Sequence, residues 1–215
     1  MKDLKLFIWD FDGTLMDTYP NLTGYLRRAL LDFGHDVPNV EILEQMLDNV
    51  GQALKHFTEK FDLPELAERY DLYYQAGRND TAELFPGVCE VLKRINAMGA
   101  RNLIYTNRGD SIYPMLERMG IAGEFAEIVN TAHPHFEWKP APGPILYLMD
   151  KYGGTPENTV MIGDRVCDLE SGYAAGCKTC HLLTPTVPQY PPCDWRIANF
   201  EEMLQLLQFS DQATQ

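Results

Sequence analysis

Residues 4–14 read Leu-Lys-Leu-Phe-Ile-Trp-Asp-Phe-Asp-Gly-Thr, and this stretch decides the fold. The apolar run over residues 4–9 predicts a short buried strand. The run stops abruptly at Asp10, Asp12 and Gly13. Ligands of open α/β sheets lie beyond the carboxyl ends of the strands. We therefore look for functional residues immediately after each predicted strand, beginning with these two carboxylates.

The pattern of apolar residues changes twice along the remaining chain. From about Tyr19 to Glu83, apolar residues recur at helical spacing and no convincing strand is present. After Pro86-Gly87, short apolar runs alternate with helical segments. Such alternation predicts a parallel sheet covered on both faces. The predicted strands are 102–106, 127–130, 159–162 and 179–183, and the predicted helices are 88–98, 111–119, 143–152, 168–175 and 201–209.

These segments predict an α/β fold. We expect a Rossmann-like, doubly wound parallel sheet with an inserted α-helical cap domain. Residues 1–16 and 85–215 would form the catalytic core, and residues 17–84 would form the cap.

Composition excludes several classes of protein. The 215 residues include 18 Lys and Arg against 31 Asp and Glu, which gives a net charge of −13. Such a charge disfavours non-specific nucleic-acid binding. The five cysteines are odd in number and scattered, as is typical of reduced thiols in a cytosol. The first apolar run is too short for a signal peptide or a membrane span. We therefore expect a cytoplasmic protein that binds neither nucleic acid nor membrane.

Polar residues of particular chemistry follow the predicted strands. Thr106 ends one strand, and Asp164 follows another, with Asp168 four residues later. Lys139 lies in a loop before a predicted helix. Carboxylates that cluster repel one another unless a cation or protons are present, and Mg²⁺ suits a site made of oxygen ligands. A carboxylate nucleophile, Mg²⁺, a hydroxyl group and a lysine together fit phosphoryl transfer through an aspartyl-phosphate.

The same residues carry a resemblance to a known family. Residues 10–14 (Asp-Phe-Asp-Gly-Thr), Thr106, Lys139 and residues 163–168 (Gly-Asp-Arg-Val-Cys-Asp) resemble the four motifs of the haloacid-dehalogenase-like hydrolase superfamily, in their usual order. A helical insertion after the first motif is similar to its phosphoglycolate-phosphatase-like and β-phosphoglucomutase-like branch. The resemblance spans almost the whole chain.

The resemblance implies a role for each motif residue. Asp10 would be the nucleophile and a Mg²⁺ ligand. Asp12 would be the general acid and then the general base, with its backbone carbonyl as a further metal ligand. Thr106 and Lys139 would bind the transferring phosphoryl group, and Asp164 would complete the metal ligands. Backbone amides at Phe11 and Asn107 would add to the phosphate site, with Thr14 and Asp168 as supporting residues.

Two positions bear on the reaction. Members of the family that act as dehalogenases lack the second aspartate, so Asp12 favours phosphate chemistry. Mutase members resemble one another in a histidine where this chain has Leu22, so hydrolysis is preferred. We expect a Mg²⁺-dependent phosphatase, monomeric or homodimeric, that acts on a small phosphorylated metabolite, with phosphoglycolate as the first candidate by resemblance. The alternatives are a phosphomutase of the β-phosphoglucomutase type and a non-catalytic regulator that binds a phosphometabolite.

Overall fold

The chain divides into two compact units, which are described separately. One unit comprises Met1–Met16 and Leu84–Gln215, and the other comprises Asp17–Glu83. We call them the sheet unit and the helical unit. The computed structural model describes residues 1, 3–47, 49–77, 81–133, 135–183 and 192–208.

The sheet unit is built on one parallel sheet. Its described residues form six strands in the order β3-β2-β1-β4-β5-β6, and each neighbouring pair is parallel. The chain order reverses beside β1, which pairs with β2 on one side and β4 on the other. This arrangement confirms the predicted doubly wound α/β fold. The strands are β1 (Leu6–Trp9), β2 (Arg101–Tyr105), β3 (Phe125–Val129), β4 (Thr159–Gly163), β5 (Lys178–Leu182) and β6 (Trp195–Ile197).

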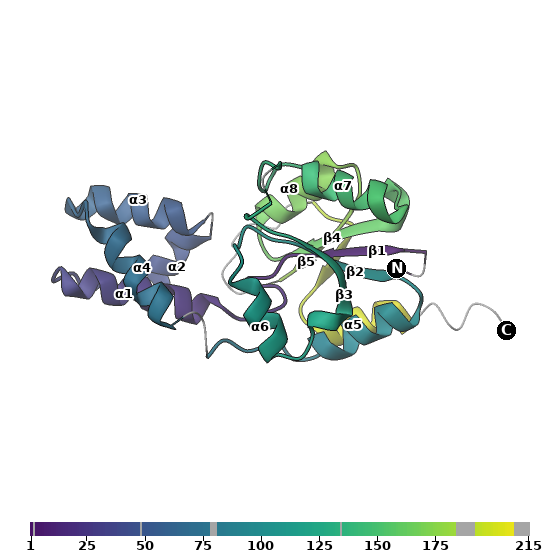
Figure 1. Cartoon of the computed structure of the whole chain (residues 1–215), viewed down its shortest axis with the longest axis horizontal. Helices are drawn as coiled ribbons and strands as arrows, with labels where there is room; N and C mark the ends of the chain where they lie inside the picture. Colours follow the sequence, from purple (N-terminus) through teal and green to yellow (C-terminus); the bar gives the residue numbers. More distant parts are fainter. Residues whose placement is uncertain (2, 48, 78–80, 134, 184–191, 209–215) are drawn as a thin grey trace. The chain divides into compact units, whose positions relative to one another are not determined.

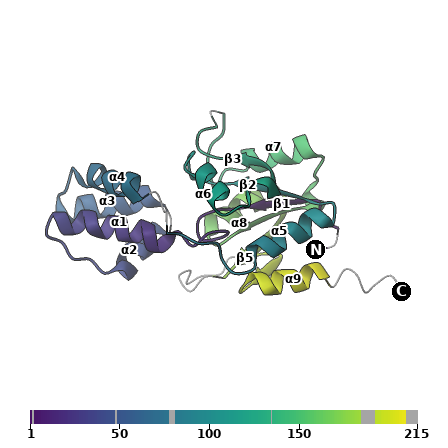
Figure 2. The ribbon, with the colours of Figure 1, turned by 60° about the horizontal axis from the view of Figure 1, so that its bottom comes forward.

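Helices cover both faces of this sheet. Figures 1 and 2 show α7 and α8 on one face and α5 and α9 on the other. Both faces are therefore shielded from water, which explains why β1 is a continuous apolar run rather than an alternating one. The helices are α5 (Val88–Ala97), α6 (Ile112–Arg118), α7 (Gly143–Tyr152), α8 (Val166–Ala174) and α9 (Phe200–Gln208), with short 3₁₀ turns η1 (Ala122–Glu124) and η2 (Pro156–Asn158).

Successive side chains of β1 enter opposite cores. Leu6 and Ile8 belong to the apolar cluster that also contains Ile145 of α7. Trp9 faces the other way and stacks on Phe200 of α9, with ring centroids 6.0 Å apart. All four side chains of the strand are buried. The central strand therefore fixes the position of Asp10, the residue that follows it, from both faces of the sheet.

The helical unit has a core of its own. Its described residues form four helices: α1 (Tyr19–Asp32), α2 (Asn39–Met46), α3 (Val50–Phe61) and α4 (Leu66–Gly77). This confirms the predicted helical character of the segment. Leu22 is a buried member of the core, so the mutase histidine is replaced by an apolar packing residue. The other fully or largely buried members are Leu26, Ala29, Leu30, Val37, Ile42, Met46, Ala53, Phe57, Leu66 and Tyr70.

Three sequence expectations need correction or extension. The helix predicted to begin at Asp168 begins at Val166. Strand β3 begins at Phe125, two residues before the predicted start. Strand β6 was not predicted, because a three-residue strand with the exposed Arg196 at its centre shows no periodicity in the sequence. Residue 209 of the last predicted helix lies outside the described residues.

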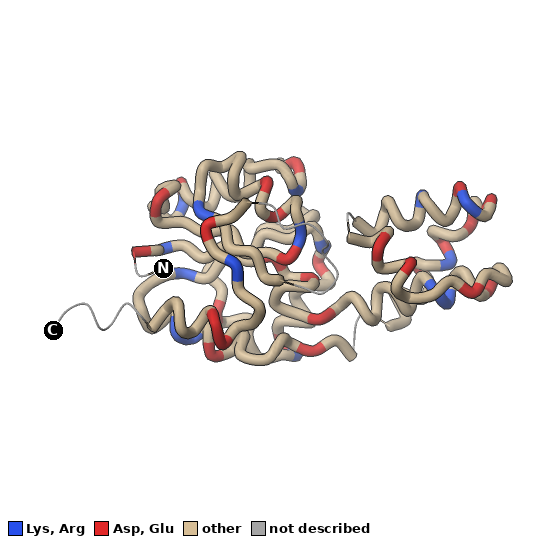
Figure 3. The backbone as a smooth tube through the Cα atoms, turned by 180° about the vertical axis from the view of Figure 1, so that it is seen from behind, with Lys and Arg blue, Asp and Glu red and all other residues tan. Residues whose placement is uncertain are grey.

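Acidic residues are spread through both units. Figure 3 shows them along the tube of each unit and interspersed with Lys and Arg.

None of the helices in the described part of the chain has the length and apolar content needed to cross a bilayer.

The Asn102 side chain connects strands β1 and β2 to helix α5 by hydrogen bonds. Its replacement tests the fold. Its side chain is buried, accepts a hydrogen bond from Trp9 Nε1 at 3.0 Å and donates one to the Leu92 carbonyl at 2.9 Å. Asn102→Ala leaves the buried indole N–H of Trp9 without its partner and removes a second donor from the Leu92 carbonyl, so we expect the free energy of unfolding to fall by about 1–3 kcal/mol. Urea unfolding followed by tryptophan fluorescence measures this, because every tryptophan lies in the sheet unit.

Lys93→Ala is the control for that measurement. Lys93 is exposed on the neighbouring helix α5, so its replacement should cost much less. Equal midpoints for the two variants would contradict the role given to Asn102.

Candidate active site

The carboxyl ends of three neighbouring strands bring the predicted residues into one place. Asp10 directly follows β1, and its backbone N–H donates to the Ile162 carbonyl of β4 at 2.8 Å. Thr106 directly follows β2, and its backbone N–H donates to the Val129 carbonyl of β3 at 3.0 Å. Asp164 directly follows β4. Rigid strands therefore present Asp10, Thr106 and Asp164 at the same edge of the sheet.

Three carboxylates meet at this edge. Asp10, Asp164 and Asp168 are each fully buried, and one oxygen from each lies within 4.8 Å of the others. Gly163 is required for this approach, since a Cβ at that position would lie 2.3 Å from the Asp168 side chain. Like charges held this close repel one another, so the cluster needs positive charge beside it.

Lys139 supplies part of that charge. Its buried Nζ lies 2.6 Å from Asp10 Oδ1 and 2.7 Å from Asp168 Oδ1, so the ammonium bridges two of the carboxylates. Burial disfavours the charged amine, but the neighbouring Asp10 and Asp168 outweigh it and raise the pKa of Lys139 above its ordinary value. The backbone N–H of Lys139 donates to Asn107 Oδ1 at 3.2 Å. The Asn107 side chain thus holds the loop that carries the lysine.

Asp168 has two structural roles at once. Its Oδ1 pairs with Lys139, and its Oδ2 accepts a hydrogen bond from the backbone N–H of Arg165 at 3.0 Å. That second contact caps the first turn of α8 from the third helical position. Both oxygens of Asp168 are therefore engaged in orienting its neighbours.

Asp164 is held by polar groups from two other segments. Thr14 Oγ1 donates to Asp164 Oδ1 at 2.9 Å. The Nε2 atom of His181, on β5, lies 2.9 Å from the backbone carbonyl of Asp164. Both partners are fully buried. These contacts fix the direction in which the Asp164 carboxylate points.

The surroundings of Asp10 disfavour its charge. Burial raises the pKa of Asp10 above its ordinary value, and the charge of Asp168 raises it further, against the opposing effects of Lys139 and Arg165. Among the described residues, Asp10 Oδ2 has no hydrogen-bond partner, and Arg165 Nη2 lies 3.8 Å from it. An oxygen in this state beside Asp164 fits the donor set of a hard divalent cation.

Asp12 lies nearer the surface and pairs with an arginine. The Nε atom of Arg108 is 3.1 Å from Asp12 Oδ1 and 3.0 Å from Asp12 Oδ2, and Arg108 Nη2 also contacts Oδ1. The backbone N–H of Arg108 donates to Thr106 Oγ1 at 3.1 Å, which closes the turn after β2. Gly13, next to Asp12, has a positive φ of 77° that suits glycine at this turn.

Sequence reasoning missed three residues of the site. Arg108, Arg165 and His181 carried no predicted role, although each directly contacts or approaches a predicted one. The sequence position of the two arginines could have indicated a role in the site, because Arg108 follows Thr106-Asn107 and Arg165 directly follows Asp164. His181 is a polar residue in a largely buried strand, and a buried polar side chain needs a hydrogen-bond partner.

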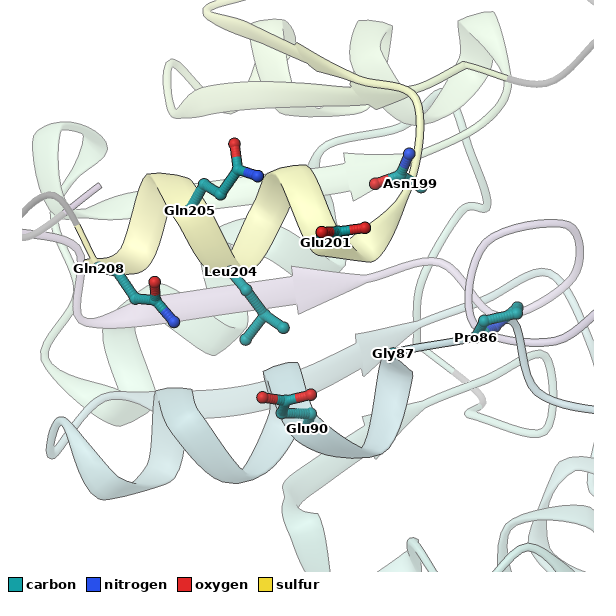
Figure 4. A pocket seen from close by; sticks show the side chains of 8 residues that line it. All are labelled: Pro86, Gly87, Glu90, Asn199, Glu201, Leu204, Gln205 and Gln208. Carbon is teal, nitrogen blue, oxygen red and sulfur yellow. The ribbon is translucent and has the colours of Figure 1, made fainter.

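A groove elsewhere on the sheet unit has different chemistry. A groove of about 700 Å³ separates α5 from α9, and Figure 4 shows Leu204 and Glu90 on its facing walls. Its described lining residues include two carboxylates, several amides and no cation, and none of them belongs to the acidic cluster. The strand ends therefore remain the candidate active site.

The strand ends combine a carboxylate nucleophile with a neighbouring cation. Asp10 offers a carboxylate oxygen without a hydrogen-bond partner in the described part of the chain, next to a buried ammonium. A buried carboxylate flanked by cationic groups can act as a nucleophile toward an electrophile whose negative charge the cations neutralise. Phosphoryl groups are such electrophiles.

Comparisons with known proteins agree with this chemistry. The model of the haloacid dehalogenase-like hydrolase family matches residues 7–182. The phosphoglycolate phosphatase of Aliivibrio fischeri is 30% identical over 190 residues, covering 83% of each chain. That of Nitrosococcus oceani is 31% identical over 185 residues, covering 81% of this chain and 82% of its own. A crystal structure described as a predicted phosphoglycolate phosphatase from Haemophilus somnus superposes with a TM-score of 0.84 at 26% identity, covering 97% of this chain and 100% of that one.

The buried charge of Asp10 yields a stability prediction. Because the pKa of Asp10 is raised in the folded state, the native protein binds more protons than the unfolded chain, and the free energy of unfolding falls as pH rises above 3.8, the ordinary value. Asp10→Asn removes this effect. Without divalent metal we expect its melting temperature to exceed that of wild type at neutral pH, with a smaller difference at acidic pH.

Thermal unfolding at several pH values in the presence of a chelator measures the effect. Asp150→Asn, an exposed substitution on α7, is the control and should shift the midpoint little at any pH. An Asp10→Asn midpoint at or below that of wild type at neutral pH would contradict the assigned cost of burying this charge.

Proposed function

The chain belongs to the haloacid dehalogenase-like hydrolase family and is a phosphatase of that family, and we propose that it hydrolyses a small phosphomonoester through an aspartyl-phosphate on Asp10. One observation carries the proposal. Asp10 is fully buried, its Oδ1 is held by Lys139 at 2.6 Å, and its Oδ2 has no hydrogen-bond partner among the described residues. One oxygen is thereby oriented and the other is available to form a bond.

In the first step, a carboxylate oxygen of Asp10 attacks the phosphorus atom. The bond from phosphorus to the leaving oxygen breaks, and that oxygen takes a proton from the Asp12 carboxyl group. Lys139 and the Thr106 hydroxyl offset charge on the phosphoryl oxygens. Amide groups of Phe11 and Asn107 would complete the phosphoryl site.

In the second step, a water molecule replaces Asp10 on phosphorus. The Asp12 carboxylate removes a proton from the water as its oxygen attacks, and the bond between phosphorus and Asp10 breaks. Inorganic phosphate is released, Asp10 returns to a carboxylate and Asp12 returns to its protonated form. Each residue ends the cycle as it began.

Mg²⁺ is the proposed metal. The donors that fit it are the Asp10 carboxylate, the Asp12 backbone carbonyl and the Asp164 carboxylate, an all-oxygen set of the kind that Mg²⁺ prefers. When bound, the ion would neutralise charge on the carboxylates and the phosphoryl group. Asp168 supports the site by orienting Lys139, and Thr14 does so by holding Asp164.

Phosphoglycolate is the proposed substrate. The named relatives in Aliivibrio fischeri and Nitrosococcus oceani support it, since both are phosphoglycolate phosphatases that match more than four fifths of this chain. We propose that the helical unit acts as a cap that selects the leaving group and excludes water. The cytoplasmic location, the lack of nucleic-acid and membrane partners, and a monomer or homodimer stay predictions of the sequence.

The test of this function is phosphate release by the purified protein from a panel of phosphomonoesters that includes 2-phosphoglycolate. We expect Mg²⁺-dependent release of one phosphate for each substrate consumed, no turnover with Asp10→Asn, and a loss of about 10²–10⁴-fold with Asp12→Asn. Acid quenching followed by mass spectrometry should find a phosphoryl group on the peptide that contains Asp10. Asp150→Asn is the control and should keep wild-type rates.

The outcomes separate the alternatives. Conversion of a sugar phosphate into its isomer with little free phosphate would indicate a mutase instead. Tight binding of a phosphometabolite without turnover would indicate a regulator. Wild-type activity in Asp10→Asn would exclude the aspartyl-phosphate.

The role of Asp164 is tested by metal titration. Asp164→Asn removes one anionic ligand, so the Mg²⁺ concentration needed for half-maximal activity should rise by about tenfold or more. Phosphate release at a series of Mg²⁺ concentrations measures this, and the midpoint for Asp150→Asn should match that of wild type. An unchanged midpoint in Asp164→Asn would remove this residue from the metal site.

A further inference from the structure

We propose that Arg108 is a positioning residue for the reaction, because it fixes the orientation of the Asp12 carboxyl group, which gives a proton to the leaving oxygen and then takes one from water. The inference rests on the proposed phosphatase function. It gives a role to a residue that the motif pattern alone did not single out.

The contact between the two residues is made by both oxygens of the carboxylate. Arg108 Nε lies 3.1 Å from Asp12 Oδ1 and 3.0 Å from Oδ2, and Nη2 reaches Oδ1 as well. A planar guanidinium that engages both oxygens defines the plane of the carboxylate as well as its position. A lysine would act as a point charge and would leave that plane free to turn.

The arginine itself is held in place by its surroundings. Its side chain is only 4% exposed, against 17% for that of Asp12. Arg108 Nη1 donates to Ser111 Oγ at 3.1 Å, and the guanidinium carbon lies 5.7 Å from the centre of the Phe11 ring. The backbone N–H of the same residue donates to Thr106 Oγ1. Arg108 is thus anchored to the turn after β2 and joins it to the loop after β1.

Stability alone does not account for this partly buried ion pair. The cost of removing two charges from water often matches or exceeds their attraction, so such pairs contribute little net stability. Proton transfer, by contrast, depends strongly on geometry, and a misplacement of about 1 Å can cost about 10²-fold in rate. Asp12 lies in a loop three residues beyond the end of β1, with Gly13 beside it, so a contact from outside the loop does most to fix its side chain.

The competing role for Arg108 is direct binding of the phosphoryl group. The two roles predict different dependence on the leaving group. A phosphoryl ligand acts on every phosphomonoester alike and contributes to binding of inorganic phosphate. A residue that positions the proton donor matters most when the leaving oxygen is strongly basic and needs a proton, and it matters little when the leaving group is a stable anion such as p-nitrophenolate.

The test compares leaving groups in Arg108→Gln and Arg108→Lys by rapid-quench measurement of the first turnover in Mg²⁺. With 2-phosphoglycolate and glycerol phosphate we expect the first-turnover rate to fall by about 10–100-fold. With p-nitrophenyl phosphate the first-turnover rate should stay near that of wild type, followed by slower steady-state turnover because Asp12 also serves the second step. Inhibition by inorganic phosphate should be unchanged.

Matched variants complete the experiment. Arg118→Gln, an exposed arginine on α6, is the control and should leave all rates unchanged. In an Asp12→Asn background, Arg108→Gln should cause no further loss, since the residue that it positions no longer transfers protons. The double variant also carries neither charge of the buried pair, so it tests the same coupling if Arg108→Gln alone fails to fold. Circular dichroism checks the folding of each variant.

Two failures are distinguishable. If wild type releases no phosphate from any substrate, the proposed function is wrong. If wild type is active but the Arg108 variants lose equal activity on all leaving groups, or bind inorganic phosphate more weakly, Arg108 is a phosphoryl ligand and the positioning role is excluded. Additive losses in the double variant would exclude it as well.

Discussion

The buried ammonium of Lys139 is the contact on which the rest of the site depends. It lies within 2.7 Å of oxygens from two carboxylates, Asp10 at the end of β1 and Asp168 on α8. Without that charge, the ends of β1 and β4 would hold a concentration of negative charge that burial makes costly. Lys139 lies in a loop 129 residues after Asp10. The site therefore forms only when these two distant segments have folded together.

The residues around this contact hold backbone rather than substrate. Asn107 binds the backbone N–H of Lys139, His181 lies against the backbone carbonyl of Asp164, and the Asp168 carboxylate accepts a hydrogen bond from the backbone N–H of Arg165. Hydrogen bonds to the main chain fix the Cα position of a catalytic residue and leave its functional group available for chemistry. The site is therefore rigid where it meets the sheet.

The sequence predicted much of this arrangement because the decisive residues follow strands directly. Asp10, Thr106 and Asp164 could be placed together from chain order and the geometry of parallel sheets alone. Arg108 and His181 could not be assigned roles, because their partners are 96 and 17 residues away, and pairing at that range depends on side-chain packing. The short strand β6 escaped prediction because three residues are too few to establish a period. Helix α8 begins at Val166, two residues before the predicted start. The acidic residue Asp168 caps the helix from its third position and does not begin it.

The helical unit closes its apolar core with its own side chains, Phe57 and Leu26 among them, and the sheet unit does the same around β1. Two crossings of the main chain connect them. Mutations can therefore accumulate in one core without loosening the other. Over evolutionary time such a layout lets the inserted helices diversify, or be exchanged as a block, while the chemistry at the strand ends is inherited intact.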